Sequence, residues 1–133
     1  MTYDEFVGQV QHRARLASTG QAVHAIHATL QTLGERLFGD EADNLASQLP
    51  QEIGAYLREA QIRESMPVRE FFERVALREG AELPDAVYHA RSVVSVVLDA
   101  VSPGEIADVR AQLPSEYDQL FQWQGEGGAQ RAA

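Results

Sequence analysis

Four histidines are the side chains best suited to acid–base or metal chemistry: His12, His24, His27 and His89. His24 and His27 are three residues apart, and a Glu-x-x-His spacing on facing helices is how di-iron bundles hold their metals. The residue three before His24 is Gln21, not glutamate. In the similar stretch 64 residues later, Tyr88 and Arg91 stand in place of His24 and His27. Since no second pair of ligands exists, the sequence predicts no metal-binding residues.

The run Asp40-Glu41-Ala42-Asp43 spells the acidic motif of helicases, which works with a phosphate-binding loop that contains lysine. The chain has no lysine, and no serine lies in the Gly-x-Ser-x-Gly pattern of hydrolases. Instead, we expect Ser18, Ser65 and Ser102 to cap helices. The sequence therefore predicts no catalytic residues, no cofactor and no cofactor-binding residues, and it favours a non-catalytic protein over an enzyme.

Composition excludes several classes of function. A length of 133 residues, of which 44% are hydrophobic, suits one compact domain. The net charge of −9 repels phosphate backbones and anionic lipids. We therefore expect neither nucleic acid nor membrane as a partner. The only candidates for a basic patch are Arg13, Arg15, Arg58 and Arg63. Because the chain has no cysteine, no basic leader and no membrane-spanning apolar run, we expect a cytoplasmic protein.

The chain repeats itself at a displacement of 64 residues. The run Gln48-Leu49-Pro50-Gln51-Glu52 returns as Gln112-Leu113-Pro114-Ser115-Glu116. Glu41 maps onto Glu105, and the apolar series Leu30, Leu33, Leu37 maps onto Val94, Val97, Val101. Matches in the same order are typical of an internal repeat. We interpret residues 1–124 as one domain of two repeats, 1–63 and 64–124, and we expect residues 125–133 to form a flexible tail.

Each repeat is predicted to form four helices. Thr2-x-x-Glu5 is a capping-box pattern that predicts a helix start, and so is Ser102-Pro103-Gly104-Glu105. The run Val93-Val94-Ser95-Val96-Val97, taken alone, favours a buried strand. We interpret it as a helix because it aligns with the leucine-lined helix of the first repeat. Pro50 and Pro114 should then turn the chain from the third helix into the fourth.

Most aromatic side chains are expected in the core at helical spacing: Phe6, Tyr56, Phe71, Phe72 and Phe121. Trp123 differs, because it follows the last predicted helix and precedes a stretch without an apolar face. A surface tryptophan at this place could anchor a partner.

The order Glu-Phe-x-x-x-Val, an apolar helix, a turn and Glu-x-x-x-Leu-x-x-Gln-Leu-Pro-x-Glu occurs twice. This pattern, over about residues 3 to 122, resembles the family named Domain of Unknown Function 2267. The second copy has Val109 where the first has Leu45. The resemblance implies a bacterial, all-helical protein, and it brings no established activity or site residues.

We therefore predict an all-α fold of about eight helices, formed by two four-helix repeats with pseudo-two-fold symmetry. We expect a non-catalytic module that binds another protein or itself, with a homodimer as one form. The alternative is a small-ligand or metal-binding protein, or an enzyme, with a polar site between the two repeats.

Overall fold

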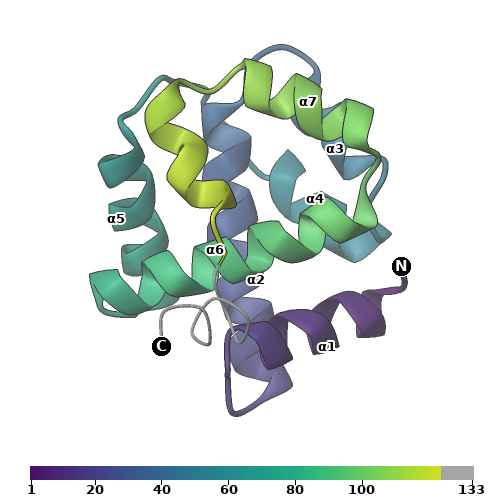
Figure 1. Ribbon diagram of the computed structural model, residues 1–133, viewed down its shortest axis with the longest axis vertical. Coiled ribbons are helices and arrows are strands. Elements are labelled where there is room, and N and C mark those ends of the chain that lie inside the picture. The colour runs from purple at the N-terminus through teal and green to yellow at the C-terminus, as the bar shows by residue number, and fades with distance from the viewer. Residues whose placement is uncertain (124–133) are drawn as a thin grey trace.

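The computed structural model describes residues 1–123, and within that range all regular structure is helical (Figure 1). The elements are α1 (Tyr3–Arg13), α2 (Thr19–Arg36), α3 (Glu41–Ala46), α4 (Gln51–Arg58), α5 (Val68–Glu79), α6 (Leu83–Ala100), α7 (Pro103–Ala111) and the 3-10 helix η1 (Ser115–Phe121). The predicted all-α fold is confirmed. The predicted tail at residues 125–133 lies outside the described residues.

Most predicted capping residues lie at helix starts. Thr2 forms a complete capping box with Glu5: the Thr2 hydroxyl accepts from the Glu5 N–H, and the Glu5 carboxylate accepts from the Thr2 N–H. Ser18 and Ser102 cap α2 and α7 with their hydroxyls. The prediction for Ser65 is wrong, because α5 begins later in the chain and no side chain caps it.

The valine-rich run at residues 93–97 is helical, as predicted from its alignment with the first repeat. All five of its residues are buried within α6. Tertiary packing therefore decides the backbone conformation here, against the strand preference of β-branched side chains.

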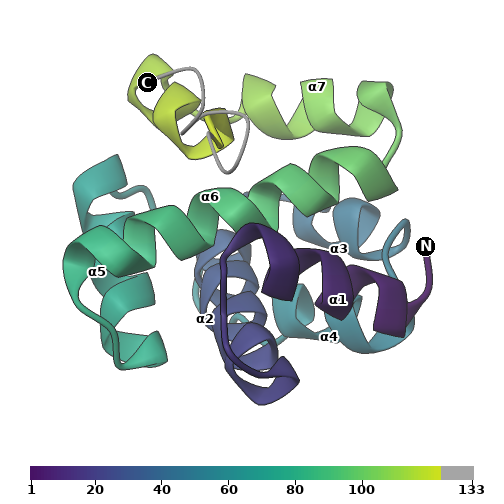
Figure 2. The ribbon, with the colours of Figure 1, turned by 60° about the horizontal axis from the view of Figure 1, so that its bottom comes forward.

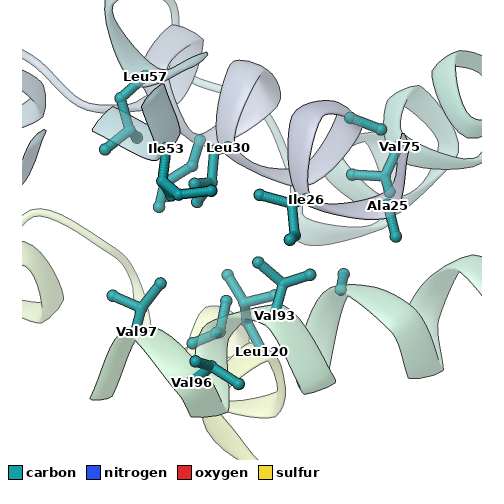
Figure 3. Close-up of a cluster of buried hydrophobic side chains, with 14 of the residues drawn as sticks. Ala25, Ile26, Leu30, Ile53, Leu57, Val75, Val93, Val96, Val97 and Leu120 are labelled. Atoms are coloured by element: carbon teal, nitrogen blue, oxygen red, sulfur yellow. The ribbon is translucent and has the colours of Figure 1, made fainter. Parts of the chain in front are cut away.

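Helices α2 and α6 cross at the centre of the molecule, and the other helices surround this pair (Figures 1 and 2). Figure 3 shows Ile26 and Leu30 of α2 facing Val93 and Val97 of α6, and none of the four is more than 4% exposed. Helices α1, α4 and α5 pack on α2, whereas α1, α5 and η1 also contact α6. Helix α7 packs on α3.

The helix order of the first half, residues 1–63, returns in the second half, residues 64–123. Helices begin at Tyr3, Thr19, Glu41 and Gln51 in the first half, and at Val68, Leu83, Pro103 and Ser115 in the second. The second helix of each half has 18 residues. The fourth helix is an α-helix in the first half and a 3-10 helix in the second. The two-fold symmetry of the predicted duplication stays a prediction.

Among the described residues, no helix combines the length and the apolar character needed to cross a membrane.

The contact between α2 and α4 depends on a glycine, which gives a first prediction. A Cβ added at Gly34 would lie 2.3 Å from the carbonyl oxygen of Leu57 and 3.2 Å from the Cβ of Ala60. Because that oxygen belongs to the backbone, Gly34→Ala must push the two helices apart, and we expect a loss of about 1–3 kcal/mol in the free energy of unfolding. Urea denaturation measures it.

The matched control is Gly104→Ala in α7, where an added Cβ meets nothing within 4 Å. This variant should unfold at the same urea concentration as the original chain or a higher one. Equal stability of the two alanine variants would contradict the close approach of α2 and α4.

Candidate functional site

A groove lies between α1, from the first half, and the C-terminal part of α6, from the second. The two helices are in contact, and Figure 2 shows α1 beside this part of α6. It consists of two hollows that meet at Asp99. The first has a volume of about 540 Å³ and is lined by Met1, Glu5, Gly8, Gln9, Asp99 and Ala100. The second has a volume of about 430 Å³ and includes His12, Arg13, Leu98, Asp99, Phe121 and Trp123 in its walls. We call these two hollows the α1–α6 groove.

Arg13 holds the aromatic end of the groove together. Its guanidinium donates to Ser95 Oγ at 3.0 Å and to the carboxylate of Asp99. The same guanidinium lies over the ring of Trp123, 5.2 Å from the ring centroid, within the range of a cation–π contact. Trp123 is thus half-buried against the first half of the chain. An apolar wall with a few oriented polar groups is typical of binding sites.

Gly8 lines the first hollow from the middle of α1. A Cβ added at Gly8 would meet nothing within 4 Å, so the packing of the chain does not require glycine here. A glycine inside a helix costs about 0.5–1 kcal/mol relative to alanine. The backbone of α1 is therefore open to the hollow at Gly8.

The first hollow is also acidic. Hydrogen bonds from the backbone N–H and the hydroxyl of Thr2 hold the pKa of Glu5 below its ordinary value, so this carboxylate is ionised at neutral pH. Asp99, which lines both hollows, keeps about half of its side chain exposed beside Arg13. The groove therefore combines the ionised carboxylate of Glu5 with an aromatic wall at its other end.

A second feature lies where α3 contacts α7. Glu41 on α3 meets Glu105 and Asp108 on α7, and one carboxylate oxygen from each lies within 4.8 Å of the other two. Glu105 is only 8% exposed, whereas Asp108 is exposed. One buried oxygen of Glu105 and one of Glu41 have no hydrogen-bond partner. We call these three residues the carboxylate cluster.

The cluster changes the protonation of Glu105. Burial raises the pKa of Glu105 to about 7, and a hydrogen bond with Glu41 and the charges of Glu41 and Asp108 act in the same direction. At neutral pH, therefore, a proton shared with Glu41 relieves part of the repulsion between α3 and α7.

Two glutamines link the two halves: the side chain of each one forms hydrogen bonds with the backbone of the other half. Gln48 Oε1 in the first half accepts from the Ser102 N–H at 2.8 Å. Gln112 Oε1 in the second half accepts from the Phe38 N–H at 2.8 Å, and its amide donates to the Phe38 carbonyl at 3.2 Å. Gln48 and Gln112 are matching residues of the repeat, and so are Phe38 and Ser102. Such an exchange is expected of two units related by a two-fold axis.

This exchange corrects one prediction about α7. In the predicted capping box, Glu105 would accept from the N–H of Ser102, but Gln48 takes that N–H instead. The side chain of Glu105 joins the carboxylate cluster. Glu41 and Glu105 are matching residues of the repeat. The displacement of 64 residues alone does not indicate that they meet where α3 contacts α7.

Two of the remaining histidines and the acidic run contact other charged side chains. His27 Nε2 lies 2.7 Å from Glu59 Oε1, His89 contacts the carboxylate of Glu79, and His24 is exposed on α2. In the acidic run at residues 40–43, Asp43 accepts from Arg58 at 2.6 Å, and Glu41 is part of the carboxylate cluster.

The charged groups between α2 and α5 pair with one another. Arg74 and Arg78 both donate to the buried Glu35, and Arg74 also donates to Glu64 and Glu70. Burial alone would raise the pKa of Glu35, but the hydrogen bonds from Arg78 and Arg74 bring it below its ordinary value. This network of two arginines and three glutamates joins the second half to α2 and pairs each of these charged side chains.

The raised pKa of Glu105 gives a prediction about stability. An unfolded glutamate has a pKa of 4.5, and the folded value is about 7, so folding takes up a proton between these values. The stabilisation from this proton is fully present below pH 4.5 and is lost as pH rises through about 7. We expect the melting temperature of the original chain to fall more between pH 5 and pH 8 than that of Glu105→Gln. Parallel melting curves for the two proteins would contradict the shared proton.

Comparison with known proteins identifies the family. A family model described as an uncharacterised conserved protein, DUF2267, matches residues 3–120. No curated protein matches the chain. The matched range includes α1 to α7, the carboxylate cluster and most of the groove, and Trp123 follows it. The resemblance inferred from the repeated pattern is confirmed, and the chain belongs to the DUF2267 family of uncharacterised conserved proteins.

Proposed function

We propose that the protein is a non-catalytic interaction module that binds a basic, amphipathic helix of a partner protein in the α1–α6 groove. The observation that carries the proposal is the groove itself, which is open between two helices and has an aromatic wall at one end. Grooves of this kind bind a helix by its apolar face.

The chemistry of the groove selects the partner. Trp123, Phe121 and Leu98 offer an apolar wall beside Arg13, and tryptophan and arginine are the residue types most often found at the energetic centres of protein interfaces. At the other end, the carboxylate of Glu5 attracts a basic side chain, whereas Asp99 is already paired with Arg13. The net charge of −9 also favours a basic partner and opposes association with a second copy of the chain.

Gly8 supports a helical partner. Small residues at a helix–helix contact let two backbones approach closely, and the space next to Gly8 is open. Gly8 lowers the stability of α1 relative to alanine and makes no internal contact that would offset this loss. Such a glycine suits a surface that packs against the backbone of another helix.

The non-catalytic part of the proposal rests on the charged groups near the seam. Arg13 is held by Asp99, Arg74 and Arg78 are held by Glu35, and these pairs leave the guanidinium groups committed to structure. The composition without cysteine and the family resemblance favour the cytoplasm of a bacterium as the location.

The test uses Trp123 as its own probe, because it is the only tryptophan in the chain. The probe ligands are peptides selected for binding from a displayed library of basic amphipathic helices. We expect a bound peptide to shift the emission of Trp123, and we expect Gly8→Leu, which places a side chain in the groove, to weaken binding at least about tenfold, or about 1.4 kcal/mol. Leucine favours the helix, so the melting temperature of Gly8→Leu should not fall.

Gly104→Leu is the matched control, since Gly104 is also an open helix position and lies outside the groove. Binding that is equally strong in both leucine variants would refute the groove as the binding surface. A failure to select any peptide that changes the emission of Trp123 would do the same. A dimer seen by sedimentation and abolished by Gly8→Leu would identify the chain itself as the partner.

A further inference from the structure

We propose that Glu41, Glu105 and Asp108 bind a divalent cation of the size of Ca²⁺ between α3 and α7. The three residues come from both halves of the chain, and Glu105 and Asp108 are three positions apart on one helix. That spacing places two side chains on the same helix face. This site is separate from the α1–α6 groove and goes beyond the interaction proposed there.

The buried oxygens indicate a missing ligand. Glu105 is more than nine-tenths buried, and one of its carboxylate oxygens has no hydrogen-bond partner. The matching glutamate, Glu41, also has a buried oxygen without a partner. A carboxylate oxygen that is withdrawn from water without a partner is costly. The proton shared by Glu105 and Glu41 offsets part of that cost, and a cation bound between the two side chains would take its place.

The donor atoms select the type of cation. All three residues offer oxygen, which hard cations such as Ca²⁺ and Mg²⁺ prefer, and none offers the nitrogen or sulfur that usually accompanies Zn²⁺. A cation that binds here displaces the proton shared by Glu105 and Glu41, and the three carboxylates that are then ionised favour a divalent ion over a monovalent one. The nearby arginines do not take this role, because Arg58 and Arg110 are paired with Asp43 and Asp118.

The coordination habits of the two ions favour Ca²⁺. The three oxygens lie within 4.8 Å of one another, close enough to contact a single ion. Ca²⁺ accepts about six to eight oxygen ligands in a flexible geometry, whereas Mg²⁺ needs a near-ideal octahedron and gives up its water reluctantly. Three carboxylates on two separate helices therefore suit Ca²⁺ better than Mg²⁺. Asp108 is exposed, so water completes the coordination from its side.

The test is a calorimetric titration of the full chain with CaCl₂ and, separately, with MgCl₂ at constant ionic strength. We expect saturable binding of one Ca²⁺ per chain, with Mg²⁺ at least about tenfold weaker. Binding should raise the melting temperature, because the ion joins α3 to α7 in the folded state only. Asp108→Asn and Glu105→Gln should each weaken Ca²⁺ binding at least about tenfold.

Glu73→Gln on α5 is the matched control, because it removes the same charge from an exposed position outside the cluster. This variant should bind Ca²⁺ as the original chain does. Asp108→Asn changes an exposed side chain, so a folding defect is not expected to hide the result. In nuclear magnetic resonance spectra, Ca²⁺ should shift the amide signals of α3 and α7 before those of α5.

The proposal is overturned by an absence of heat and of any melting shift at millimolar Ca²⁺. It is also overturned if Asp108→Asn and Glu73→Gln weaken binding equally, since that result describes a general attraction of cations to an acidic surface. Binding of peptides in the groove is measured independently, so failure of the cation site leaves the groove proposal standing.

Discussion

The packing of α2 against α6 is the interaction on which the rest of the structure depends. Both helices have 18 residues, and small side chains on each, including Ala22, Ala25, Ala86 and Ala90, are fully buried. They let larger residues such as Ile26 and Val93 meet across the crossing (Figure 3). Full burial of one such aliphatic side chain contributes about 1.5–3 kcal/mol, so a few of them account for a large part of the stability of a small domain.

This crossing also determines where the halves leave room for function. Because α2 and α6 cross, their ends diverge, and the shorter helices pack on the sides where the ends separate (Figures 1 and 2). One side brings α1 along the C-terminal part of α6, and another brings α3 to α7. The groove and the carboxylate cluster are therefore both formed where the two halves of the chain meet.

Local patterns in the sequence predicted most of the fold. Capping residues such as Thr2 and Ser102, and the proline-marked turns, act within a few residues, so their effect could be derived without tertiary information. The helix at residues 93–97 required the alignment of the two repeats, because valine alone favours a strand. Tyr117 was not singled out, although it is fully buried and its hydroxyl donates to the Met66 carbonyl at 2.7 Å.

The candidate sites depend on contacts that local patterns do not determine. Glu105 occupies the capping-box position of α7, and only the approach of Gln48 from the other half explains why its carboxylate turns to Glu41. Trp123 could be recognised as unusual from its place in the chain, but not its contact with Arg13. Each of these contacts joins residues that are more than 50 positions apart in the chain, so it can be derived only from the tertiary structure.

The two features are neighbours along the chain, which has a thermodynamic consequence. Asp99, where the two hollows of the groove meet, and Ala100 are the last residues of α6, and α7 begins at Pro103 with Glu105 in its first turn. Only Val101 and Ser102 separate the two helices. Any change in groove affinity caused by a ligand of the cluster must be matched by an equal change in cluster affinity caused by a groove ligand, since coupling free energies are reciprocal.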